Sequence, residues 1–153
     1  MCLSIKNTGL KIEIDVYDKQ MTFKRRKEIS LKNIDYETVE VYKAGEHIYH
    51  FYTVKENKMN YLTVQQYNLD IEKKGDALVL DSTSLKLGVN YSEFKIARAK
   101  TGAYILIYKY EFSGGRIDKL FTMVMDGESK IIQKNEINLS DDNFSPVLIK
   151  RTY

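Results

Sequence analysis

The chain has 153 residues, of which 43% are hydrophobic and 29% are charged, and its 24 basic and 21 acidic residues leave a formal net charge of +3. This length suits one domain with its own core, and the balanced charge gives no reason to expect nucleic acid or a membrane surface as a partner. The single cysteine, Cys2, excludes an intramolecular disulfide. No stretch resembles a signal peptide or a membrane-spanning helix, so the default location is cytoplasmic, or extracytoplasmic if the chain is a processed piece.

The apolar residues alternate with polar ones almost throughout, which is the pattern of half-buried strands. The composition agrees, since 12 Tyr, 6 Phe and many Ile, Val and Thr favour strands over helices. Turn signals rich in Gly, Asn, Asp and Ser separate the runs. The sequence therefore predicts an all-β, antiparallel fold of about eleven strands. In chain order they are expected at residues 10–18, 23–31, 37–43, 46–54, 60–68, 76–82, 93–98, 103–112, 119–126, 130–139 and 146–151.

Four kinds of strand recur along the chain at a spacing of about 55 residues. "DYETVEVYK" from Asp35 aligns without gaps with "NYSEFKIAR" from Asn90 and "NFSPVLIKR" from Asn143, at offsets of 55 and 53 residues. "GEHIYHFYTV" likewise aligns with "GAYILIYKYE". A third kind of strand ends three times in an apolar residue followed by Asp18, Asn68 or Asp126, residue types that start turns. A fourth strand follows in each case, at residues 23–31, 76–82 and 130–139. Four element types in a constant order indicate an internal repeat.

The repeat predicts a single domain or fragment, 1–153, made of four-stranded units. A partial unit covers residues 10–32, complete units cover 35–83 and 90–140, and residues 143–151 form the first strand of a further unit. A four-stranded antiparallel unit of this length resembles a blade of a β-propeller. No Trp and no double-glycine signature point to a particular propeller family.

The number of units conflicts with a closed propeller, which typically has four to eight blades. Three arrangements would resolve the conflict. The chain is part of a longer protein, or it assembles with other copies as a homo-oligomer, or the strands close instead into a single β-barrel or a β-sandwich.

The basic residue that ends the first strand of each unit is the candidate binding position. Lys43, Arg98 and Arg151 follow the apolar pairs of the three aligned stretches at the same offset. In a propeller the first strand is innermost, so the resemblance implies that these side chains approach the rim of a central opening. There they would bind an anion or an acidic partner.

No catalytic residue is assigned, and neither a metal nor a cofactor is expected. His47 and His50 stand three residues apart in a strand and so face opposite sides of it, which prevents joint chelation of one metal. The basic run at residues 24–27 suits a charged edge strand. The expected function is a non-enzymatic binding or scaffold module that engages a protein or glycan partner. The alternatives are a β-barrel that binds an apolar small molecule and an enzyme with its site on the rim of the repeats.

Overall fold

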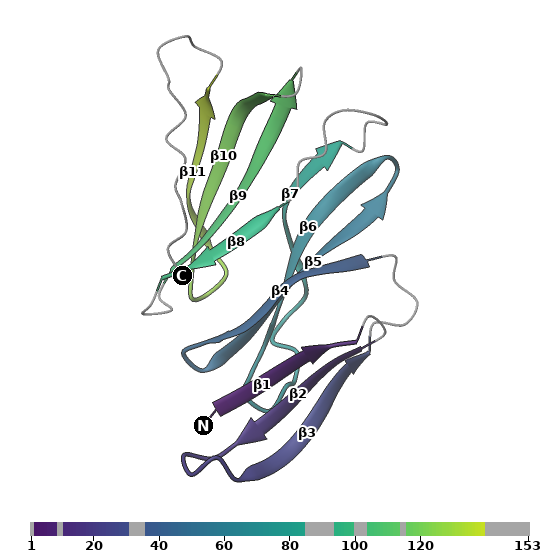
Figure 1. The fold of residues 1–153 in the computed structure, drawn as a ribbon, viewed down its shortest axis with the longest axis vertical. Helices are drawn as coiled ribbons and strands as arrows, with labels where there is room; N and C mark the ends of the chain where they lie inside the picture. The colour runs from purple at the N-terminus through teal and green to yellow at the C-terminus, as the bar shows by residue number, and fades with distance from the viewer. Residues whose placement is uncertain are drawn as a thin grey trace.

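The computed structural model describes residues 2–8, 11–30, 36–84, 94–99, 104–113 and 116–139. Within these residues the regular structure consists of antiparallel strands in three sheets, and no helix is present (Figure 1). The strands are β1 (Cys2–Asn7), β2 (Lys11–Tyr17), β3 (Phe23–Ser30), β4 (Tyr36–Ala44), β5 (His47–Glu56), β6 (Met59–Tyr67), β7 (Leu78–Ser84), β8 (Lys95–Arg98), β9 (Tyr104–Ser113), β10 (Arg116–Asp126) and β11 (Ile131–Asn138). None of the described segments is a helix with the length and hydropathy needed to cross a membrane.

Each sheet is made of strands that are consecutive in the chain. Sheet A contains β1, β2 and β3, sheet B contains β4 to β7, and sheet C contains β8 to β11, in sequence order across each sheet. The prediction of an antiparallel all-β fold is confirmed, and β2 to β11 each overlap an expected strand. The strand β1 was not expected from the sequence, because its two apolar residues give too short an alternation. The strand expected at residues 146–151 lies outside the described residues.

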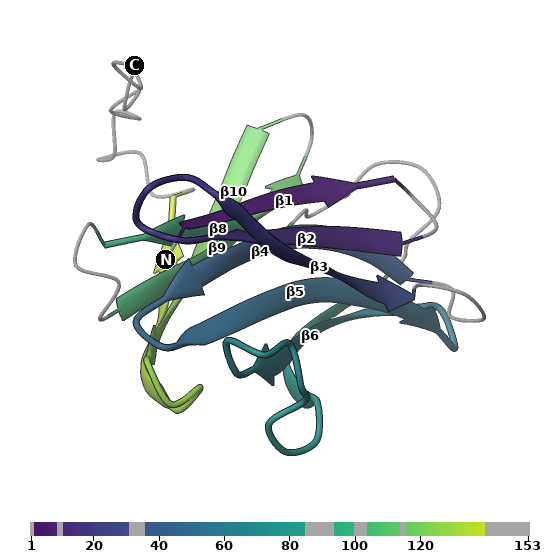
Figure 2. The ribbon, with the colours of Figure 1, turned by 90° about the horizontal axis from the view of Figure 1, so that it is seen from below.

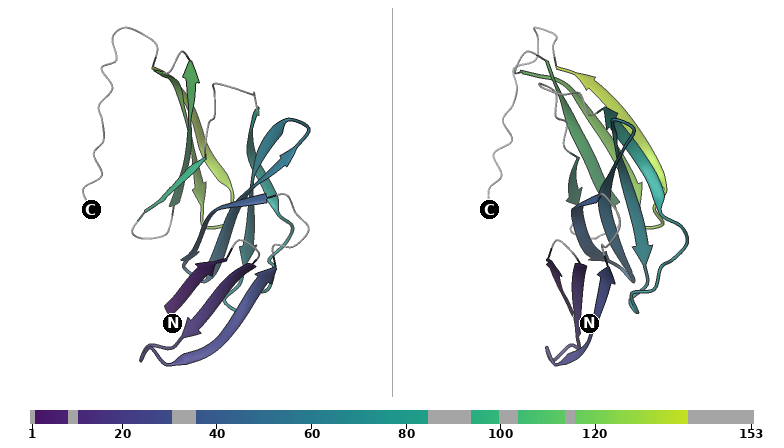
Figure 3. Two further views of the ribbon diagram at one scale, coloured as in Figure 1. Left: turned by 45° about the vertical axis from the view of Figure 1, so that its right-hand side comes forward. Right: turned by 90° about the vertical axis from the view of Figure 1, so that its right-hand side faces the viewer.

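Sheet B lies between the other two sheets. Figure 2 shows sheet A lying over sheet B, and Figure 3 shows sheets A and C at opposite ends of the molecule. No pairing joins one sheet to another among the described strands, so these strands do not close into a barrel, and the barrel alternative is not realised in them. They also form no closed ring, so a propeller arrangement stays a prediction.

The alternation seen in the sequence places one row of apolar residues of each strand in a core. Ile12, Ile14 and Val16 of β2 are buried, with 0%, 0% and 4% of their surfaces exposed, whereas the intervening Lys11, Glu13 and Asp15 face away. The core between sheets A and B is completed by Ile48 and Tyr67, with Leu3, Ile5, Ile29, Val41 and Ile71 at its margin.

A larger core lies between sheets B and C. Its buried residues include Tyr42, Tyr49, Phe51, Leu62 and Val64 from sheet B and Ile105, Ile107, Met123 and Met125 from sheet C. The rings of Tyr42, Tyr49 and Phe51 stack at centroid distances of 5.7 to 6.4 Å. Aromatic pairs in this geometry stabilise by about 0.5–1.5 kcal/mol beyond their burial, so the tyrosine content of the chain serves the packing of sheets.

The turn after the third strand of each unit has the same geometry three times. The Oδ1 atoms of Asp18, Asn68 and Asp126 each accept hydrogen bonds, 2.9 Å long, from the backbone N–H groups two and four residues later. The residue three positions later has a positive φ in each copy: 60° at Met21, 62° at Ile71 and 66° at Ser129. The turns predicted from the sequence are therefore formed. They make β2, β6 and β10 equivalent, so sheet A lacks a described counterpart of β4 and β8.

Candidate functional site

The three basic residues predicted as a joint binding site have separate surroundings. Lys43 Nζ donates a hydrogen bond of 2.6 Å to the carbonyl oxygen of Gly45. The guanidinium of Arg98 lies over the ring of Tyr42, 5.2 Å from its centroid. Arg151 lies outside the described residues. No contact between Lys43 and Arg98 is present in the described part of the chain, so an anion site formed by the three stays a prediction.

The contact with Arg98 explains the position of a buried tyrosine. Tyr42 is 2% exposed, and its hydroxyl has no hydrogen-bond partner within the part of the chain that the structure describes. Burial raises the pKa of this phenol well above its usual value, whereas the nearby Arg98 charge opposes the rise. A cation over an aromatic ring contributes about 0.5–2 kcal/mol, so Arg98 has a packing role between sheets B and C.

A buried lysine stands at the contact between sheets B and C. Lys109 of β9 is 7% exposed, and its Nζ lies 5.2 Å from the ring centroid of Phe94 and 5.1 Å from that of Phe121. The same Nζ forms an ion pair of 2.8 Å with Asp81 of β7 and donates a hydrogen bond of 2.8 Å to the carbonyl oxygen of Ser82.

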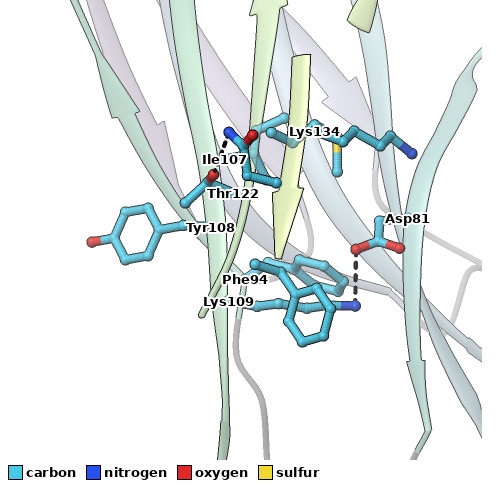
Figure 4. Close-up of a pocket in the computed structure, with 10 residues that line it drawn as sticks. Asp81, Phe94, Ile107, Tyr108, Lys109, Thr122 and Lys134 are labelled. Atoms are coloured by element: carbon cyan, nitrogen blue, oxygen red, sulfur yellow. Dashed lines mark hydrogen bonds and ion pairs between the residues drawn. The ribbon is translucent and has the colours of Figure 1, made fainter. Parts of the chain in front are cut away.

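Figure 4 shows this cluster, with the Lys109 side chain directed toward Asp81 and Tyr108 pointing the other way. The cleft around it has a volume of ≈ 140 Å³, which is below the usual range for small-molecule sites, about 300–1,000 Å³. Lys109 and Asp81 neutralise each other, and the Lys134 Nζ donates a hydrogen bond of 3.5 Å to the carbonyl oxygen of Leu80. The Lys109 cluster is therefore a bridge between two sheets rather than a ligand site.

A larger groove runs between β4 and β8, the first strands of sheets B and C. These two strands are in contact, and the groove beside them has a volume of ≈ 470 Å³. It is lined by Glu37, Thr38, Val39, Glu40, Thr53, Asn60, Phe94, Lys95, Ile96 and Tyr108. We call it the β4–β8 groove. Its volume is in the range of small-molecule sites.

The register of sheet B places polar side chains on the groove side. Phe51 belongs to the core between sheets B and C, and Thr53 follows it by two residues on the same face of β5. Glu37 pairs with Thr53 and Glu40 pairs with Phe51, so both carboxylates lie on that face of β4. A bulge between Thr38 and Glu40 brings the two glutamates to the same side, because it shifts the alternation by one residue.

One acceptor in the β4–β8 groove is buried without a partner. Asn60 is 5% exposed, and its Oδ1 atom has no hydrogen-bond partner among the described residues. A buried polar atom left unsatisfied costs about 1–3 kcal/mol, and this cost is relieved when a water, an ion or a ligand supplies the missing bond. With Glu37 and Glu40, the groove offers acceptors to a molecule that carries hydroxyl or other donor groups.

Sequence reasoning did not find this groove. Glu37, Glu40 and Asn60 stand at ordinary polar positions of their strands, and only the bulge in β4 and the contact of β4 with β8 bring them together. Lys109 gave a stronger signal, because it occupies the third place in the inward row that begins with Ile105 and Ile107. No group of three or more His, Cys, Asp or Glu side chains suitable for a metal is present in the described ranges.

Comparisons with known proteins return no relative for this chain: no protein-family model, no curated protein and no solved structure matches it.

Proposed function

We propose that this chain is a non-enzymatic binding module, built of propeller-like four-stranded repeats, which holds a glycan in the β4–β8 groove. The stacking of sheet C on sheet B and the contact of their first strands support the propeller-like arrangement. The observation that carries the binding proposal is the buried, unpartnered Oδ1 atom of Asn60 beside Glu37 and Glu40.

The chemistry of the groove favours a polyhydroxylated ligand. Carboxylate and amide oxygens accept hydrogen bonds from sugar hydroxyl groups, and the hydroxyl of Thr53 both donates and accepts. Val39 and Ile96, which are only partly buried, supply the apolar surface on which the C–H face of a sugar ring can pack. Acidic and amide side chains around an apolar patch give orientation as well as affinity.

The test is a glycan-binding screen of the full chain, followed by titration of the strongest ligand by isothermal calorimetry. Thr53→Val removes one hydroxyl from the groove with almost no change of shape, and Asn60→Leu removes the amide. We expect each variant to weaken binding at least tenfold while retaining the fold measured by circular dichroism.

Thr63→Val is the matched control, because Thr63 is also buried, at 5% exposed, but follows Leu62 in β6 and so lies on the opposite face of sheet B. It should leave the affinity within twofold of the native value. Equal loss of binding in Thr53→Val and Thr63→Val, or a screen in which no glycan binds, would contradict the proposal.

A further inference from the structure

Sheet C has an apolar face that no described element covers. Ile105 and Ile107 of β9 point toward sheet B and are buried, so the alternate residues of β9 point away from it. Tyr104 is 52% exposed and Leu106 38% exposed. Pairing continues this row onto the neighbouring strands, and the whole row is called here the outer face of sheet C. Its apolar side chains in β9, β10 and β11 are Tyr104, Leu106, Tyr108, Tyr110, Leu120, Val124 and Ile137, and the same register also places Lys95, Ala97, Thr122, Gln133 and Asn135 on this face.

The same face is buried in the other two sheets. The strands β2, β6 and β10 are aligned by the turn residues that follow them, Asp18, Asn68 and Asp126. The residues six and four positions before the turn residue are Ile12 and Ile14 in β2, Leu62 and Val64 in β6, and Leu120 and Thr122 in β10. The β2 residues are covered by sheet B and the β6 residues by sheet C, all at 2% exposed or less. In β10 the corresponding side chains are only half-buried. The outer face of sheet C therefore corresponds to the face that packs against a neighbouring sheet in sheets A and B.

The outer face of sheet A is not a suitable cover for it. There Lys11 pairs with Glu13 at 2.8 Å, and Arg26 pairs with Asp15 at 2.6 Å. The ion pair with Arg26 lowers the pKa of Asp15. These side chains satisfy one another in contact with water, and moving them against an apolar sheet would remove their hydration without supplying new partners. Sheet A thus resembles the polar cap that ends a stack of repeats.

We propose that the outer face of sheet C binds the outer face of sheet C in a second copy of this chain, as a two-fold symmetric dimer. A two-fold interface places the same surface on both subunits, which satisfies both exposed apolar faces without burying the ion pairs of sheet A. Four strands of about eight residues, spaced by about 4.8 Å, present a face of roughly 500–600 Å². The two copies together would then bury about 1,000–1,200 Å², which reaches the lower range of specific interfaces.

The experiment is sedimentation velocity of the full chain over a hundredfold range of concentration. The native chain is expected to sediment as a dimer that dissociates on dilution. Leu106→Lys places a charge at the centre of the face and should produce a monomer at every concentration. Tyr104→Lys, at a more exposed position, gives a second reading if Leu106→Lys fails to fold.

Val79→Lys is the matched control, because Val79 is 57% exposed on β7 of sheet B, outside this face. It should sediment as the native chain does. A native chain that is monomeric at every concentration would overturn the proposal. It would do so even if other residues of the same chain cover the face. A dimer that persists in both Leu106→Lys and Tyr104→Lys would also overturn it.

Discussion

Tyr49 of β5 donates the hydrogen of its hydroxyl group to the carbonyl oxygen of Gly127, in the turn that joins β10 to β11. The bond ties a side chain of sheet B to the backbone of sheet C. Gln66 supports it, because its Nε2 atom lies 3.2 Å from the Tyr49 hydroxyl and 3.4 Å from the same carbonyl. A partly buried network of this kind fixes how the two sheets are positioned, in addition to their apolar contact.

Tyr49→Phe removes the hydrogen bond to Gly127 and leaves the packing of the ring unchanged. We expect the free energy of unfolding to fall by about 1 kcal/mol, the usual net value of one hydrogen bond, as measured by urea denaturation. Tyr104→Phe, at a 52% exposed position, should change it by less than about 0.5 kcal/mol. Equal effects of the two substitutions would show that the Tyr49 hydroxyl does not join the sheets.

The ion pair between Lys109 and Asp81 should show strong coupling. Asp81→Asn leaves the buried ammonium without its counter-charge and should cost about 3 kcal/mol, whereas Lys109→Met leaves an aspartate that is 29% exposed and should cost less. The double variant should recover at least about 1 kcal/mol of the summed cost.

The pair of Lys119 and Glu136, whose side chains are 34% and 47% exposed, is the control for this cycle. Its coupling should be clearly weaker than that of Lys109 with Asp81, because exposed ion pairs are screened by solvent. Similar coupling in both cycles would place Lys109 in water rather than between the rings of Phe94 and Phe121.

The turn after β2 offers a stabilising substitution. Met21 has a φ of 60°, a conformation that side chains with a Cβ atom rarely adopt, and it is 63% exposed, so its side chain contributes little packing. Met21→Gly should raise the free energy of unfolding by about 0.5–1 kcal/mol. Gln20→Gly, one residue earlier at an ordinary backbone conformation, should lower it. A loss of stability in Met21→Gly would contradict the turn geometry.

His50 should make the fold sensitive to mild acid. Burial lowers the pKa of His50 from 6.5 to about 4, and its Nε2 atom lies 3.1 Å from the hydroxyl of Thr38. Above pH 6.5 the residue is neutral in both states and the stability does not change. Between pH 6.5 and about 4 the unfolded chain binds a proton that the folded chain does not, so the free energy of unfolding decreases as the pH is lowered. The loss reaches about 2 kcal/mol at pH 5.

His50→Gln should remove this dependence. The native chain and His50→Gln are compared by urea denaturation at pH 7.5 and pH 5, and the carboxylates, which both proteins share, cancel in the comparison. The expected result is a larger loss in the native chain. The same loss in both proteins would mean that His50 is hydrated in the fold.

The sequence was sufficient for every described strand except β1 and for the three Asp and Asn turns, because these depend on local patterns. Alternation located β2 to β11, and the apolar residue before Asp18, Asn68 and Asp126 marked three turns that share one hydrogen-bond pattern. Alternation along β9 also implies that one of its two rows of residues faces a neighbouring sheet, but only the structure shows that this row contains Ile105 and Ile107 rather than the tyrosines.

The candidate site could not be predicted in this way, because it depends on contacts between strands distant in sequence. Asn60 and Phe94 meet in the β4–β8 groove only after sheet C has packed on sheet B. The short strand β1 was missed because its place in sheet A comes from pairing with β2 rather than from its own pattern.

Three separate sheets stack in the order A, B, C, and methyl-to-methyl NOE spectroscopy of the full chain tests this arrangement most directly. Contacts are expected from Ile12 and Ile14 to Ile48, and from Ile105 and Ile107 to Leu62 and Val64. No contact should join Ile12 or Ile14 to Ile105 or Ile107, because sheet B separates them. Direct contacts between those two pairs of isoleucines would contradict the stacked arrangement.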